Sequence, residues 1–117
     1  MYEEFLGVRA PSRSLGILQD IHWSMGAIGY FPTYTLGNLY SAQLLAAARS
    51  DLPNHDDQVR DGDFGPLLEW MRKHVHQRGS ILKPADLIEE ATGSPPSPDA
   101  FVEYLVNKIG RLYGMGE

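Results

Sequence analysis

The segment from Tyr34 to Ser50 limits the possible folds more than any other part of the sequence. It reads YTLGNLYSAQLLAAARS, and its apolar residues occupy nearly every face of the helix that it predicts. We expect such a helix to be buried on most sides, with small residues allowing neighbouring helices to approach closely. A chain of 117 residues has little material with which to surround it, so the pattern points to partners outside this sequence.

The other predicted elements are also helical. Glycines and prolines separate the apolar patterns, and Gly26, Gly29 and Pro32 exclude a regular helix over residues 24–33. The opening Met1 has no capping residue before it, which suggests a helix cut at a gene boundary. No segment alternates with a period of two residues, so the predicted fold class is all-α. Further helices are expected at residues 2–6, 15–23, 66–77 and 84–91, and from Pro98 onward behind an N-cap at Ser97.

Composition excludes several classes of function. The chain has no cysteine, so disulfides and thiolate chemistry are absent. Its net charge is −5 with scattered basic residues, which argues against a nucleic-acid partner. It contains no apolar run of membrane-spanning length, and its N-terminus lacks the pattern of a signal peptide. We therefore expect a cytoplasmic protein with no membrane association.

The richest chemistry lies between Gly16 and Asn38, where polar and aromatic side chains crowd onto a glycine-containing loop before the long helix. His22 suits a hydrogen bond to a substrate carbonyl or carboxylate through a ring N–H, although a purely structural histidine fits the spacing at least as well. A tyrosine phenol suits donation to an oxyanion, and each tyrosine taken alone fits a core role better. The candidate residues are Gln19, Asp20, His22, Trp23, Tyr30 and Tyr34.

The remaining histidines and acidic pairs carry weaker signals. His74 and His76 are two residues apart and diverge on a helix, so a favourable interaction with the helix C-terminus explains them better than a shared metal. The residues His55-Asp56-Asp57 are expected on a solvated loop, and Glu89-Glu90 on a wet helix face. The sequence has no H-E-x-x-H motif, no phosphate-binding glycine loop and no nucleophile elbow, so we expect no metal site in this chain.

The run Gly16-Ile-Leu-Gln19-Asp20-Ile-His22-Trp23 fits the pattern G-x-x-Q-D-x-H-W, and GYFPTYTLGN follows it at residues 29–38. Together these segments resemble the C-terminal portion of the carboxypeptidase Taq family of zinc metallocarboxypeptidases. EEFLGVRAP before the motif and the segments from Gly62 onward are similar to the same family, so the likeness covers nearly the whole chain.

The resemblance implies a C-terminal helical segment of a neurolysin-like fold with a deep substrate groove. Members of the family release single residues from peptide C-termini with a zinc-activated water. They hold zinc through the two histidines of H-E-x-x-H and a downstream glutamate, and this sequence has no such set. Gln19, Asp20, His22 and Trp23 would line the substrate groove and restrict the C-terminal end of the substrate. His22 would bind the peptide, and either Tyr30 or Tyr34 would donate to the oxyanion.

The leading interpretation is therefore a fragment of a metallocarboxypeptidase that is inactive alone. Its partners would be the peptide substrate and the rest of the catalytic domain, and exposed apolar surface would favour a homo-oligomer. Two alternatives remain open. One is a subunit of a split peptidase, and the other is a non-catalytic helical interaction module.

Overall fold

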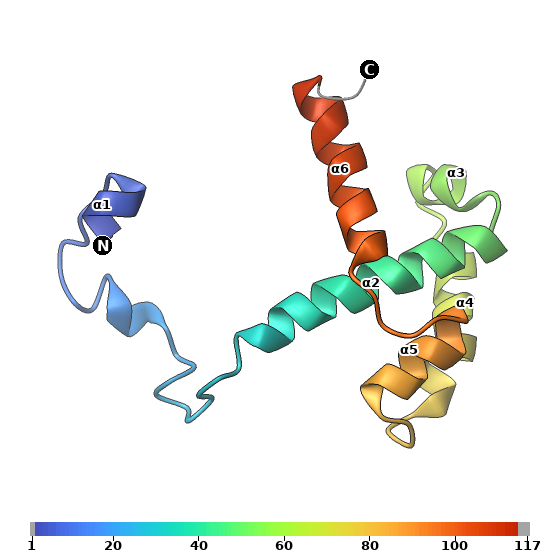
Figure 1. Ribbon diagram of the computed structural model, residues 1–117, viewed down its shortest axis with the longest axis horizontal. Coiled ribbons are helices and arrows are strands. Elements are labelled where there is room, and N and C mark those ends of the chain that lie inside the picture. Colours follow the sequence, from blue (N-terminus) through green and yellow to red (C-terminus); the bar gives the residue numbers. More distant parts are fainter. Residues whose placement is uncertain (1, 115–117) are drawn as a thin grey trace. The chain divides into compact units, whose positions relative to one another are not determined.

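The computed structural model describes residues 2–114, and of Tyr2 only the backbone. Every regular element in this range is a helix and none is a strand, so the predicted all-α class is confirmed (Figure 1). The expected interruption of a helix at Met1 lies outside the described residues. The elements are α1 (Tyr2–Leu6), η1 (Ile17–Gln19), α2 (Pro32–Asp51), α3 (His55–Arg60), α4 (Gly65–His74), η2 (His76–Arg78), α5 (Pro84–Thr92) and α6 (Asp99–Tyr113).

The helix predicted over residues 15–23 is wrong. Only the single 3₁₀ turn η1 forms there, and Asp20 then adopts extended backbone angles (φ −75°, ψ 119°). The Asp20 side chain accepts the backbone N–H of His22 at 2.7 Å, which is a local turn that competes with helical hydrogen bonding. The apolar spacing was therefore compatible with a helix, but one short acidic side chain redirects the backbone.

The later helices lie close to their predicted positions. The helix α2 begins at Pro32, slightly earlier than expected, because proline suits the start of a helix, where its missing N–H has no partner to lose. The segment predicted as one helix over residues 66–77 is divided into α4 and η2, with Val75 between them. The helix α6 starts at Asp99, whose backbone N–H donates to the Ser97 hydroxyl at 3.1 Å.

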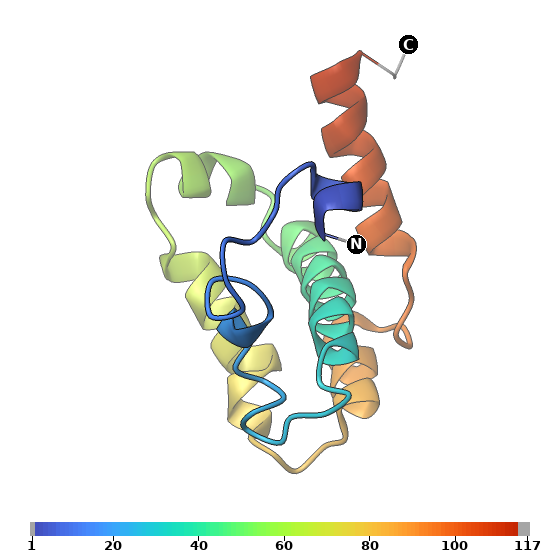
Figure 2. The same ribbon diagram turned by 90° about the vertical axis from the view of Figure 1, so that its left-hand side faces the viewer.

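The chain forms two compact units, and the boundary between them falls in the first turn of α2. We call residues up to Thr33 the N-terminal unit and residues from Tyr34 onward the helical unit. Within the helical unit, α6 begins beside the middle of α2 and extends away from it, while α3, α4 and α5 gather around the C-terminal half of α2 (Figures 1 and 2). The buried residues among those described are few: Gln43, Ala48, His55, Trp70, Ile88 and Ala91.

Polar contacts also link neighbouring helices of this unit. The indole N–H of Trp70 on α4 donates to the Asp51 carboxylate at the end of α2, at 2.7 Å. The guanidinium of Arg78 on η2 forms an ion pair with Glu90 on α5 at 2.6 Å. These contacts fix junctions between helices where little apolar surface is buried.

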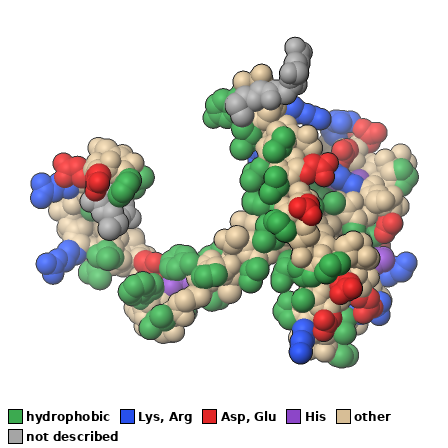
Figure 3. Space-filling model, in the orientation of Figure 1, with side chains coloured by type: hydrophobic (Ala, Val, Ile, Leu, Met, Phe, Trp, Pro, Cys, Tyr) green, Lys and Arg blue, Asp and Glu red, His purple; other side chains and the backbone are tan. Residues whose placement is uncertain are grey.

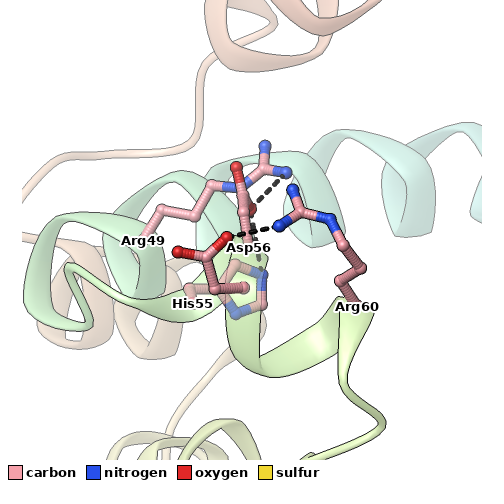
Figure 4. A network of polar contacts seen from close by, with 5 residues as sticks. Arg49, His55, Asp56 and Arg60 are labelled. Atoms are coloured by element: carbon pink, nitrogen blue, oxygen red, sulfur yellow. Dashed lines mark hydrogen bonds and ion pairs between the residues drawn. The ribbon is translucent and has the colours of Figure 1, made fainter.

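A third contact network joins the end of α2 to α3 and corrects an expectation about His55. The residues HDDQVR form a short helix, and His55 is only 5% exposed rather than lying on a solvated loop. In Figure 4, Arg49 of α2 reaches Asp56, whose carboxylate also lies 3.9 Å from Nε2 of His55. The sequence did not predict this helix because its own apolar pattern is too weak, and the contact with Arg49 comes from another helix.

The expectation that α2 is buried on most sides is not met within this chain. Leu36 in its first half is 47% exposed, and of its residues only Gln43 and Ala48 are buried. The apolar stripe of α6 is half-buried near its start but exposed towards its end, where Leu112 is 71% exposed. Figure 3 shows apolar side chains along α6 and where α6 begins beside α2. Among the described helices, none combines the length and hydropathy that a bilayer crossing requires.

Candidate functional site

The candidate site lies in the N-terminal unit and begins with a tight turn at Gly16. Its backbone N–H donates to the Arg13 carbonyl at 3.2 Å, and the Leu18 N–H donates to the same carbonyl at 3.1 Å. A Cβ atom at position 16 would lie 2.9 Å from the Cβ of Ala10, closer than side chains approach one another. Glycine is therefore required for the close approach that starts the site.

Asp20 and His22 form the central polar pair of the site. One carboxylate oxygen of Asp20, Oδ1, accepts both the backbone N–H of His22 at 2.7 Å and a hydrogen bond from ring atom Nδ1 at 2.9 Å. These two contacts with His22, the backbone one first, lower the pKa of Asp20 below its usual value. Asp20 is therefore ionised at neutral pH and acts only as an acceptor.

Two aromatic rings pack against the imidazole of His22. The imidazole of His22 stacks on Tyr30 with ring centroids 5.7 Å apart, and on the tilted ring of Phe31 at 4.9 Å. The chain reverses between them through Gly29, whose positive φ of 76° favours glycine, and the Thr33 hydroxyl donates to the Tyr30 carbonyl at 2.6 Å. Phe31 was not predicted as a site residue, and its position directly before Pro32 was the only local signal for it.

A hollow of about 460 Å³ opens beside the pair and is lined by Gly16, Ile17, Gln19, Asp20, Ile21 and His22. The Gln19 side-chain amide donates to the Ser14 carbonyl, which anchors it at the rim. The adjacent Trp23 side chain projects into solvent and is 71% exposed. The structure thus brings three predicted residues together around His22. Gln19 and Asp20 line the hollow with it, and Tyr30 stacks on its imidazole.

Tyr34 has a different structural setting. It lies in the first turn of α2 and is the first residue of the helical unit. Its side chain is about half exposed. Its predicted role as an oxyanion donor stays a prediction, as does that of Tyr30.

A second groove, of about 640 Å³, runs between α2 and α6 in the helical unit. It mixes apolar residues such as Leu45 and Leu112 with charged ones such as Arg49 and Arg111. On its α6 side, Lys108 donates to the Tyr104 hydroxyl at 3.0 Å, and this bond raises the pKa of the lysine. The groove holds no arrangement of side chains that matches acid–base or nucleophilic catalysis.

The described residues do not fit a metal site. Within residues 2–114, no three His, Asp or Glu side chains converge closely enough to hold an ion, whereas a zinc site uses three or four such ligands. His74 instead ends α4, where it stacks on Trp70 with ring centroids 4.5 Å apart, and His76 lies on η2. No catalytic step through a metal follows from this part of the chain.

The sequence is similar to those of known carboxypeptidases. A family model described as carboxypeptidase Taq (M32) metallopeptidase matches residues 1–109. Thermostable carboxypeptidase 1 of Thermus thermophilus is 43% identical over 113 residues, which are 97% of this chain and 22% of that protein. Carboxypeptidase 1 of Bacillus subtilis is 41% identical over 112 residues, which are 96% of this chain and 22% of that protein.

Solved structures of carboxypeptidases are also similar to this chain. The crystal structure of an M32 carboxypeptidase from Deinococcus radiodurans is similar to this chain with a TM-score of 0.80 and 44% identity. The match covers 97% of this chain and 23% of that one. The chain therefore spans about 22% of the length of the curated relatives that it matches.

Proposed function

Because the chain belongs to the carboxypeptidase Taq (M32) metallopeptidase family, we propose that it is the C-terminal part of a metallocarboxypeptidase that removes single residues from peptide C-termini. The observation that carries this proposal is the cluster of Asp20, His22 and Tyr30 beside the 460 Å³ hollow. It lies in the region matched by the family model and supplies hydrogen-bonding groups for a peptide.

The cluster suggests a role for each predicted residue. His22 binds the peptide backbone, and Gln19 and Asp20 form the wall of the hollow beside it. Trp23 adds an exposed ring that covers the substrate, because large aromatic side chains bury much apolar area at low entropic cost. Either Tyr30 or Tyr34 donates to the oxyanion of the tetrahedral intermediate, since a phenol placed there stabilises developing negative charge.

The metal of the complete protein, which we propose to be zinc, is held by residues outside the described range. A Lewis acid that activates water is needed for hydrolysis of this type, and the described side chains offer no ligand set for it. We therefore expect the isolated chain to be inactive towards peptides, with or without added zinc. Its contribution is to bind and orient the substrate.

The test is a chimera in which this chain replaces the matching segment of Bacillus subtilis carboxypeptidase 1. Release of the C-terminal residue from a peptide is measured for the chimera and for variants of it. His22→Ala should lower kcat/KM by about 10- to 100-fold, the effect of losing one strong hydrogen bond. The matched control is His76→Ala, which removes an exposed imidazole on η2 and should leave kcat/KM unchanged.

The tyrosines are tested in the same chimera. Tyr30→Phe or Tyr34→Phe should lower kcat by about 100- to 1,000-fold, the usual cost of one oxyanion donor. Tyr113→Phe is the control, because Tyr113 is exposed at the end of α6. If both variants hydrolyse peptide as fast as the control, neither tyrosine is the oxyanion donor.

The two alternatives predict different outcomes. For a split peptidase, mixing this chain with a separate polypeptide that supplies the rest of the domain restores hydrolysis. For a non-catalytic interaction module, the chimera is inactive while the chain alone still binds peptides. Activity that depends on His22 only in the covalent chimera supports the leading proposal.

The exposed apolar surface implies partners within the same protein. We propose that the rest of the catalytic domain covers the apolar faces of α2 and α6 in a cytoplasmic enzyme. The isolated chain should then self-associate through these faces, because large apolar patches favour association in water. Size-exclusion chromatography with light scattering checks this, and a compact monomer at every concentration contradicts it.

A further inference from the structure

The groove between α2 and α6 carries a surplus of positive charge towards the end of α6. Five of the residues that line it are charged: Arg49, Asp56, Glu103, Lys108 and Arg111. Arg49 and Asp56 neutralise each other through an ion pair at 3.0 Å. Among the described residues, no carboxylate forms an ion pair with Lys108 or Arg111. The groove therefore presents two cations that this part of the chain does not neutralise.

These two cations lie together on one face of α6, because Lys108 and Arg111 are three residues apart. Glu103 lies five residues before Lys108, which is about 7.5 Å along the helix axis, so it leaves this end of the groove positive. The Lys108 ammonium is held in place, since it donates to the Tyr104 hydroxyl at 3.0 Å and lies 5.4 Å from the centroid of that ring. The hydrogen bond raises the pKa of Lys108, so the ammonium is charged at neutral pH.

We propose that a segment of the rest of the catalytic domain fills this groove and carries an Asp or Glu side chain that pairs with Lys108 and Arg111. The proposal rests on the function proposed above and specifies the chemistry of the surface that covers α6. A cation that is covered loses its contact with water, and this is unfavourable unless a carboxylate replaces the water. The bond to Tyr104 keeps the Lys108 ammonium where the covering segment meets it.

Two observations favour an occupant from the same protein. This chain spans 22% of Bacillus subtilis carboxypeptidase 1, so most of the length of such a protein lies outside it. The walls of the groove also suit a helix, because Ala42 and Ala46 on α2 and Ala100 on α6 are small enough for a neighbouring backbone to approach closely. A second copy of this chain is the competing occupant, and the test distinguishes it.

The test is zero-length cross-linking in the chimera with Bacillus subtilis carboxypeptidase 1. A water-soluble carbodiimide joins a lysine amine to a carboxylate only where the two are in contact, and mass spectrometry of the digested monomer band identifies both residues. We expect an amide bond between Lys108 and an Asp or Glu from the Bacillus subtilis part of the chimera. Lys108→Arg is the matched control, because arginine keeps the charge but does not form this amide, so the cross-link should disappear.

Acetylation of Lys108 supplies an independent measure of the pairing. A carboxylate within about 4–6 Å raises the pKa of a lysine by one unit or more, which lowers the reactive free amine about 10-fold. Lys108 should therefore react with acetic anhydride at least about 10-fold more slowly in the chimera than in a dilute solution of the isolated chain. A free lysine derivative added to both samples calibrates the reagent.

The outcomes separate this inference from the proposed function. A cross-link from Lys108 to the Bacillus subtilis part supports both. Slow acetylation of Lys108 without that cross-link overturns the inference, because the groove is then covered by a surface without an acid, and it leaves the proposed covering of α6 intact. A cross-link that joins two chains overturns the inference in favour of a second copy. Unchanged acetylation overturns both the inference and the proposed covering of α6.

Discussion

Replacing Gln43 by methionine should destabilise the helical unit by about 2 kcal/mol. Gln43 is buried on α2, and its amide N–H₂ donates to the Thr92 hydroxyl and to the carbonyls of Ser94 and Pro95, each at 3.1 Å. Its carbonyl accepts the backbone N–H of Ser97, also at 3.1 Å. One side chain thus fixes the whole connection between α5 and α6.

The size of this destabilisation depends on which hydrogen-bond partners of Gln43 water can reach after the substitution. Ser94 and Pro95 are exposed, so their carbonyls recover hydrogen bonds to water and contribute little to the loss. The half-buried Ser97 N–H and Thr92 hydroxyl each lose a hydrogen bond with a net worth of about 1 kcal/mol. Methionine has nearly the same volume as glutamine, so no cavity term is added. With a urea m-value of about 1–1.5 kcal/mol/M, the unfolding midpoint should fall by roughly 1.5 M.

Urea unfolding followed by circular dichroism and tryptophan fluorescence measures the change. Gln77→Met is the matched control, because Gln77 is exposed on η2 and its loss should cost less than about 0.5 kcal/mol. Amide hydrogen exchange supplies a local readout, since the Ser97 N–H should lose protection only in Gln43→Met. Equal midpoints for the two variants, with Ser97 still protected, would refute the reasoning.

Three other predictions concern separate parts of the chain. Trp70→Phe should cost about 1–2 kcal/mol in urea unfolding because the indole bond to Asp51 is lost, while Asp51→Asn keeps an acceptor and should cost less. Gly16→Ala should perturb the NMR shifts of residues 10–16 because its Cβ meets Ala10, whereas Gly37→Ala in open space on α2 should stabilise the chain by up to about 1 kcal/mol. The pKa of Asp20 is lowered, so the contact with His22 stabilises the turn above the unfolded pKa of about 3.9 and is lost as pH falls through the lower native value. In NMR titrations, the carboxyl midpoint of Asp20 should therefore lie below the usual aspartate value of about 3.9.

Helix positions were predictable where local chemistry decides them. The helix α5 begins at Pro84, where a missing N–H does no harm, and ends at Thr92, directly before Gly93, whose φ of 77° a side chain would disfavour. These signals depend on only a few neighbouring residues, so they do not depend on the surrounding tertiary structure. The family resemblance was also predictable and is confirmed, because the G-x-x-Q-D-x-H-W pattern is specific.

The errors fall where side chains override backbone patterns. The turn at Asp20 replaces a predicted helix because its carboxylate takes the N–H of His22, a contact that apolar periodicity does not report. The helix α3 was missed because its six residues, HDDQVR, have almost no apolar pattern, and the contact that Arg49 makes with it comes from α2. Of the candidate site, the pairing of Asp20 with His22 needed the real backbone angles, since on the predicted helix Asp20 shares a face with Trp23.

The distribution of contacts in the helical unit is consistent with the proposed role of this chain as one part of a larger catalytic domain. Its helices are joined at their ends by polar side chains, as between Trp70 and Asp51 or Arg78 and Glu90, and such bonds depend on direction. They therefore set helix positions while burying little apolar area. The apolar faces of α2 and α6 are left for hydrophobic contacts, which are non-directional and adapt to whichever surface covers them. It follows that covering these faces should raise stability strongly while leaving the polar junctions unchanged. In the chimera, Gln43→Met should accordingly still expose the Ser97 amide to exchange, although the unfolding midpoint of the whole protein lies higher.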